Sequence, residues 1–189
     1  MKADDQTRRR GLLALIASDL RDKAEWLYGS RAPRSILKAF ATDGTGAMLL
    51  YRLMQAAHRM HLGPLAMLFN KLNVVCGRCV IGRGADFGPG FVLIHSLGVV
   101  INASVRGGAH VKLEHQVTLG AEKGRSPVLG DDVFVGAGAK ILGGVRIGHR
   151  AKVGANAVVL QDVPDGATAV GVPARIVSSP SGPDAGLTS

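Results

Sequence analysis

Six histidines and one pair of cysteines are the side chains in this sequence that could do chemistry near neutral pH. An imidazole has an unperturbed pKa near 6.5, so it can take a proton from a hydroxyl group and return it. Cys76 and Cys79 form a C-x-x-C pair, which is typical of a redox centre or half of a zinc site. No second Cys or His pair has the spacing that would complete four zinc ligands. We therefore expect no metal, and interpret the cysteines as small residues opening a structural repeat.

The net charge of +9 is compatible with nucleic acid, an anionic membrane surface or an anionic cofactor as a partner. Nucleic-acid binding is not expected, because aromatic residues make up only 4% of the chain and are not interleaved with basic ones. No apolar run reaches the roughly 18 residues of a membrane span. No signal peptide is visible, so we expect a cytoplasmic protein.

A six-residue period in the second half of the sequence indicates the elements that position these side chains. A triangular coil explains such a period, because each hexad supplies a short strand and a corner, and three hexads make one 18-residue turn. Helical and simple strand patterns do not fit it. Counting in sixes from residue 75 to 159 reaches a large apolar residue at every position except Lys123: Val75, Ile81, Phe87, Leu93, Val99, Val105, Val111, Val117, Leu129, Val135, Ile141, Ile147, Val153 and Val159.

Lys123 marks a loop, because a charged side chain would be very costly inside so narrow a core. We expect residues 120–127 to be extruded from the coils, and loops on a rigid scaffold commonly carry function. The sequence divides into a helical segment at 1–72, a β-helix at 73–177 and a flexible tail at 178–189. Within the first segment we expect helical stretches over 8–28 and 47–70, the second kinked or divided at Gly63-Pro64, forming a cap on the β-helix. Docking of this basic segment on an anionic membrane is the alternative.

Four stretches of the repeat region resemble the motifs of the serine acetyltransferase family of hexapeptide-repeat acyltransferases. They are residues 117–120 (VTLG), 135–143 (VGAGAKILG), 153–155 (VGA) and 169–177 (AVGVPARIV). The resemblance spans residues 78–177 and implies a mainly β fold, a left-handed parallel β-helix with an N-terminal α-helical cap. Residues 94–102 (IHSLGVVIN) and the short cap resemble more closely the exopolysaccharide (colanic-acid type) acetyltransferase branch.

The family resemblance implies an acetyl-CoA-dependent O-acetyltransferase with His95 as its catalytic base. His95 is the third residue of its hexad, outside the inward-facing set, so packing does not explain it. His115 matches a histidine of the polysaccharide-type branch and is expected to share acceptor binding or proton handling. Packing in a corner is an equal alternative for His115.

Two positions near His95 depart from the serine acetyltransferase pattern. The aspartate that orients the family's base is replaced by Val80, and the acid that contacts the amino-acid substrate is replaced by Ile94. We therefore expect a sugar or exopolysaccharide precursor as acceptor, with L-serine as the alternative and a non-enzymatic scaffold as a second alternative. The group that orients His95 stays open among Glu114, Asp86 and a backbone carbonyl.

Acetyl-CoA is the co-substrate that the resemblance implies, and the family usually assembles as a homotrimer with active sites shared between subunits. Small residues along the path of the pantetheine arm match Gly120, Ala121, Ala137 and Ala155. Lys140 and Arg175 are cations near the expected position of the phosphates. A solvated surface charge is an equal interpretation for either cation.

Overall fold

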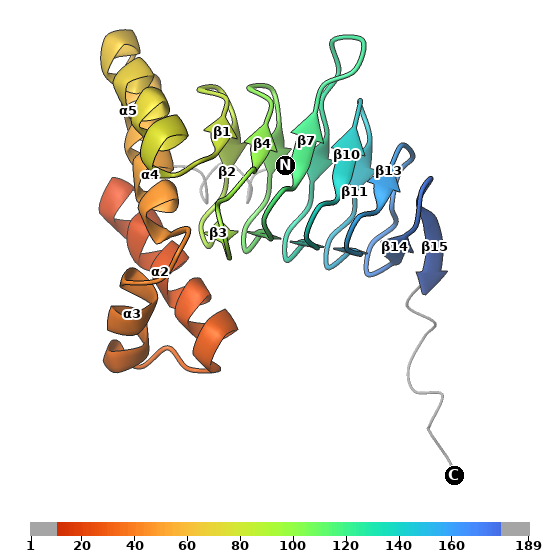
Figure 1. Ribbon diagram of the computed structural model, residues 1–189, viewed down its shortest axis with the longest axis horizontal. Coiled ribbons are helices and arrows are strands. Elements are labelled where there is room, and N and C mark those ends of the chain that lie inside the picture. The colour runs from red at the N-terminus through yellow and green to blue at the C-terminus, as the bar shows by residue number, and fades with distance from the viewer. Residues whose placement is uncertain (1–10, 179–189) are drawn as a thin grey trace.

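The computed structural model describes residues 11–178, which form four helices followed by a parallel β-helix (Figure 1). The helices, together called the helical cap below, lie across one end of the β-helix. Their bounds differ from the sequence prediction in two ways. A short helix that begins with Pro33 was missed, although proline is favoured at this position, and α5 ends at Cys76, beyond the predicted division at 72. The helices are α2 (Leu12–Tyr28), α3 (Pro33–Phe40), α4 (Thr45–Arg59) and α5 (Gly63–Cys76).

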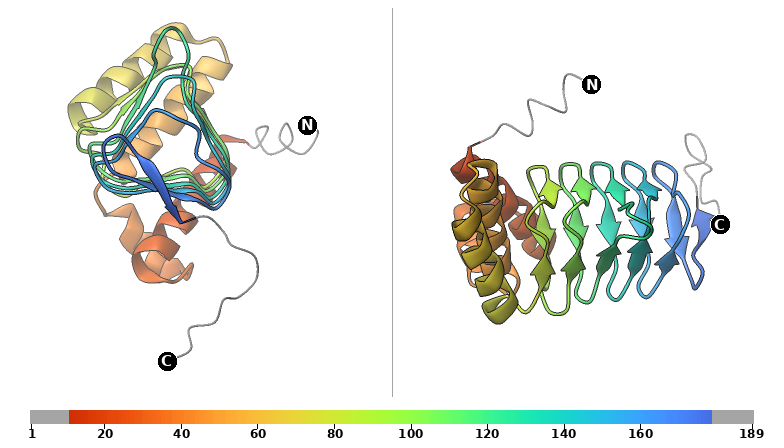
Figure 2. Two further views of the ribbon diagram at one scale, coloured as in Figure 1. Left: turned by 90° about the vertical axis from the view of Figure 1, so that its right-hand side faces the viewer. Right: turned by 90° about the horizontal axis from the view of Figure 1, so that it is seen from above.

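The strands stack into three sheets, and the coils have a triangular outline when viewed along the axis (Figure 2). All pairings between strands are parallel except the last, β14 with β15. The first sheet has the order β1-β4-β7-β10-β13, the second β11-β8-β5-β2 and the third β15-β14-β12-β9-β6-β3. The strands are β1 (Val80–Ile81), β2 (Asp86–Phe87), β3 (Val92–Leu93), β4 (Val100–Ile101), β5 (Arg106–Gly107), β6 (Lys112–Leu113), β7 (Thr118–Gly120), β8 (Val128–Leu129), β9 (Phe134–Val135), β10 (Lys140–Leu142), β11 (Arg146–Ile147), β12 (Lys152–Val153), β13 (Val158–Val159), β14 (Thr168–Val170) and β15 (Arg175–Ser178).

The mainly β, coiled architecture predicted from the period of six is therefore confirmed, but the spacing between coils departs from 18 residues in three places. Paired residues in β4 and β7, Val100 and Thr118, are 18 positions apart, as the period requires. The separation is 20 between Val80 and Val100 in β1 and β4, and 22 between Thr118 and Lys140 in β7 and β10. The coils that begin with β1 and β7 thus contain insertions of two and four residues, whereas Lys152 and Thr168 in β12 and β14 are only 16 positions apart.

The two-residue insertion lies in the turn between β3 and β4, which contains His95. Leu93 and Ile101 are 8 positions apart there, whereas Leu113 and Leu119 in the next coil are 6 apart. Counting in sixes did not detect this insertion, because the valines that it reached next, from Val99 to Val117, are buried as well. These valines lie before the strands, whose own inward residues are Ile101, Gly107, Leu113 and Leu119.

The four-residue insertion is the loop predicted around Lys123, which projects beyond the coils after β7 (Figure 1). Gly120 belongs to β7, so the loop comprises residues 121–127. Glu122 and Arg125 exchange backbone hydrogen bonds of 2.9 and 3.0 Å across its tip. Lys123 is exposed, so its charge stays in water as expected.

Side chains of the helical cap donate hydrogen bonds to carbonyl groups on the open edge of the first coil. An uncovered strand edge leaves backbone groups without partners, and burying it unpaired would cost free energy. The cap therefore stabilises the edge and is held in register with it. The pairs are Asn70 with Ile81 O, Tyr51 with Ala85 O, Arg52 with Phe87 O and Gly88 O, and Lys23 with Leu93 O.

Cys76 and Cys79 lie where the helical cap joins the first coil. Cys76 is the last residue of α5, and Cys79 is buried just before β1, where its thiol lies 3.3 Å from the Asn73 side-chain oxygen. Burial raises the pKa of Cys79 to about 12, which disfavours the thiolate needed for redox or metal chemistry. Over residues 11–178, no helix is long and apolar enough to cross a membrane. The predicted tail lies outside the described residues apart from Ser178.

Candidate active site

His95 lies in the lengthened turn that leads from the third sheet to the first, a position called the His95 corner below. Its side chain is 52% exposed, and Nδ1 is 3.1 Å from Asp43 Oδ2. A carboxylate beside Nδ1 favours a proton on that nitrogen. Nε2 then keeps its lone pair, so the ring is arranged to accept a proton there.

His115 occupies the equivalent corner position one coil later, because β3 and β6 pair Leu93 with Leu113. The rings of His95 and His115 have centroids 6.0 Å apart and an edge-to-face angle of 72°. The structure thus brings the two predicted catalytic histidines together. His115 Nδ1 is 3.6 Å from Glu114 Oε2, too long for a hydrogen bond.

Ala137 and Ala155 continue the same column of corner residues in the next two coils. The pairings of β6 with β9 and of β9 with β12 place them above His115 in turn. Two imidazoles are therefore followed by two methyl groups, and small side chains leave the column open. Lys140 reaches back to this corner, where its Nζ donates to Gln116 O at 2.8 Å and to Gly138 O at 2.9 Å. These bonds favour a role in holding the corner.

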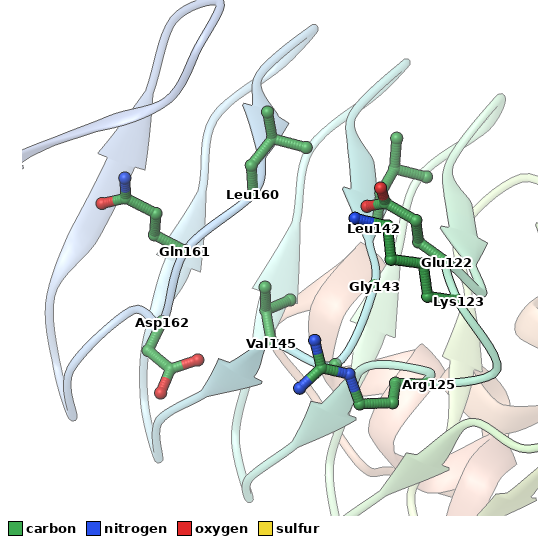
Figure 3. A pocket seen from close by; sticks show the side chains of 10 residues that line it. Glu122, Lys123, Arg125, Leu142, Gly143, Val145, Leu160, Gln161 and Asp162 are labelled. Atoms are coloured by element: carbon green, nitrogen blue, oxygen red, sulfur yellow. The ribbon is translucent and has the colours of Figure 1, made fainter.

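Gly120 and Ala121 lie at the end of β7 that is farther from the His95 corner, where the strand leads into the loop. A Cβ atom at Gly120 would be 2.8 Å from Leu142 Cδ2, which is the end of a flexible side chain and can turn aside. The loop overhangs a cleft of about 240 Å³, whose walls carry both charged and aliphatic side chains (Figure 3). The cleft is lined by Glu122, Lys123, Arg125, Leu142, Gly143, Gly144, Val145, Leu160, Gln161 and Asp162.

A single chain does not bring the loop to the His95 corner. His115 and Ala121 lie at the two ends of the segment that contains β7, at most about 20 Å apart for six extended residues. Arg175 is exposed on β15, beyond the last coil, and four strand spacings separate β14 from β3, again about 20 Å. The predicted cofactor residues therefore form separate groups along the β-helix.

Asp43 is a site residue that the sequence did not reveal. It lies in the turn between α3 and α4, a segment whose glycines and threonines indicate only a break between helices. The candidates for orienting His95 have other partners: Asp86 accepts hydrogen bonds from Gln55 and Arg59 at 2.7 Å, and Glu114 faces His115.

Comparisons with known proteins agree with this geometry. The model of the bacterial transferase hexapeptide family (six repeats) matches residues 126–161. The serine acetyltransferase of Helicobacter pylori (strain ATCC 700392 / 26695) is 42% identical over 139 residues, which cover 71% of this chain and 81% of that protein.

Similar proteins have been solved with ligands bound. A Neisseria gonorrhoeae serine acetyltransferase in complex with serine has a TM-score of 0.78 and 32% identity, covering 92% of this chain and 70% of that one. A serine acetyltransferase in complex with CoA has a TM-score of 0.77 and 31% identity, covering 92% and 73%. These relatives give no support to the exopolysaccharide branch. The chain belongs to the serine acetyltransferase family within the hexapeptide-repeat transferases and is an acetyltransferase that uses acetyl-CoA.

Proposed function

We propose that this enzyme transfers the acetyl group of acetyl-CoA to the hydroxyl group of L-serine, with His95 as general base. The observation that carries the proposal is the exposed imidazole whose Nδ1 lies against a carboxylate, which leaves Nε2 to accept a proton. As Nε2 takes the hydroxyl proton, the oxygen attacks the thioester carbonyl. The C–O bond forms, the C–S bond breaks, and the leaving sulfur takes the proton from the imidazolium.

Serine replaces the sugar acceptor that the sequence favoured, because the relatives named above are serine acetyltransferases. The sequence argument against serine was the missing acid at Ile94, which is indeed buried, with 4% exposure. A sugar hydroxyl remains the second candidate, favoured by the apolar residue directly before His95.

A homotrimer would complete the site. Within one chain the His95 corner and the loop lie at opposite edges of the first sheet, so we propose that the loop of one subunit covers the His95 corner of its neighbour. Ala137 and Ala155 would border the pantetheine arm, Lys140 would hold the corner beside it, Arg175 would lie toward the phosphates, and His115 would lie beside the acceptor. Light scattering should give three times the chain mass of 19.6 kDa. A monomer that is fully active would contradict this assembly.

The acceptor and the base are tested by measuring coenzyme A release with L-serine and with a panel of nucleotide sugars and oligosaccharides. We expect release with serine, and a loss of about 10²–10⁴-fold in His95→Ala, the contribution typical of a positioned base. His58→Ala, which removes an exposed imidazole of α4, is the matched control. Release with sugars alone would overturn the acceptor, and a fully active His95→Ala would overturn the base.

A further inference from the structure

We propose that Asp43 is the positioning residue of the catalytic base, so that the helical cap completes an active site otherwise built on the β-helix. The inference rests on the proposed role of His95. Asp43 Oδ2 accepts a hydrogen bond from Nδ1 of His95 over 3.1 Å, and this bond fixes both the ring orientation and the tautomer. The carboxylate thus takes the role that Val80 cannot fill.

Lys23 fixes the backbone of Asp43 to the strand that leads into His95. This side chain is fully buried, with 0% exposure, and its Nζ donates to Leu93 O at 2.9 Å and also to Asp43 O. Leu93 is the last residue of β3, two positions before His95. One amine therefore holds both partners of the carboxylate–imidazole pair at a fixed separation. Burial lowers the pKa of Lys23 to about 8, although Asp43 opposes the shift.

The turn that carries Asp43 is itself closely held. Thr42 and Thr45 each donate a hydroxyl hydrogen bond to Ala39 O at 2.7 Å. Gly44 has a φ of +78°, and a Cβ atom there would be 2.5 Å from Leu93 O. The turn therefore packs tightly against the edge of β3. This rigidity allows the Asp43 side chain to hold the His95 ring in one orientation.

Among the carboxylates of residues 11–178, that of Asp43 lies within hydrogen-bond distance of the His95 ring. Both side chains are more than half exposed in the single chain, at 52% and 60%, so water weakens their attraction. The expected contribution is therefore smaller than that of the base itself. We expect Asp43→Asn to lower kcat about 10- to 100-fold, the range known for removal of the hydrogen-bond partner that orients a metal-bound histidine.

The kinetic test compares Asp43→Asn with Glu25→Gln, which makes the same charge change on α2 at a carboxylate that pairs with Arg31. Positioning predicts a lower kcat in Asp43→Asn, with KM for acetyl-CoA and for the acceptor within about twofold of wild type. A raised acceptor KM with unchanged kcat would assign Asp43 to substrate binding and overturn the inference. Unchanged kinetics would overturn it as well.

The tautomer gives a readout that does not need turnover. In ¹⁵N-histidine-labelled protein, with the His95 signals assigned by their loss in His95→Ala, we expect the neutral ring to carry its proton on Nδ1. Asp43→Asn, and Lys23→Met to a lesser degree, should move part of the population to the Nε2–H form. A wild-type ring protonated on Nε2, or a tautomer unaffected by Asp43→Asn, would overturn the inference. An active His95→Ala would instead refute the proposed function and leave this measurement intact.

Discussion

His95 and Asp43 are 52 positions apart in the sequence, and only one of them carries a signal there. His95 falls outside the inward-facing set and lies in a family motif, so the sequence predicts it. Asp43 belongs to no repeat and no helix, and its position depends on how a turn of the helical cap docks on β3. Sequence spacing holds no information about that contact.

At the residue scale, Gly44→Ala should lower stability by about 1–3 kcal/mol, because alanine resists a positive φ and its Cβ would collide with Leu93 O. The displaced turn should also lower kcat. Urea unfolding and the acetyl-transfer assay measure the two effects. Gly46→Ala is the matched control, since a Cβ atom there meets nothing within 4 Å. Equal stability of the two variants would contradict the strain argument.

The helices of the cap cover the end of the β-helix with buried polar side chains. Arg52, on α4, is buried against Asp19 of α2 at 2.7 Å and against the backbone of the first coil. Burial raises the pKa of Asp19 in spite of this neighbour, so the carboxylate needs the guanidinium to stay ionised. The sequence predicted a helical cap but not this pair, because a basic residue in an amphipathic helix usually faces water.

Removal of one member of that pair should be more damaging than removal of both. Arg52→Met removes the guanidinium group from a buried carboxylate and from two carbonyl groups, so we expect a loss of about 3–5 kcal/mol in urea unfolding. Asp19→Leu combined with Arg52→Met should recover part of it. A single-variant loss below about 1 kcal/mol would mean that the cap edge finds other partners.

The contact of α2 with the third sheet should depend on pH. His110 Nδ1 and Asp22 form a hydrogen bond that raises the pKa of His110 above its ordinary 6.5, while partial burial opposes the shift. A raised folded-state pKa means that the stabilisation is complete below about 6.5 and is lost as pH rises through the folded value. His110→Ala should therefore lower Tm more at about pH 5.5 than at about pH 9. A pH-independent loss, like that expected of His58→Ala, would contradict this.

At the scale of the whole molecule, the period of six was enough to predict a β-helix of stacked triangular coils with a loop projecting from it. It did not locate the two-residue insertion, because the buried valines that precede the strands kept the apolar count intact. That insertion widens the corner in which His95 lies, and the four-residue insertion forms the loop at the other edge of the first sheet. The two proposed parts of the active site, the His95 corner and the loop, therefore lie at the two insertions in the coils around β3 to β8.

The functional coupling of Asp43, in the cap, to His95, in the β-helix, is tested most directly by combining His95→Ala with Asp43→Asn and measuring kcat for acetyl transfer. If the carboxylate acts through the imidazole, the double variant should be no slower than His95→Ala alone, because nothing remains to be positioned. Multiplied losses, with the double variant a further 10-fold or more below His95→Ala, would show that the two groups act independently and contradict the account.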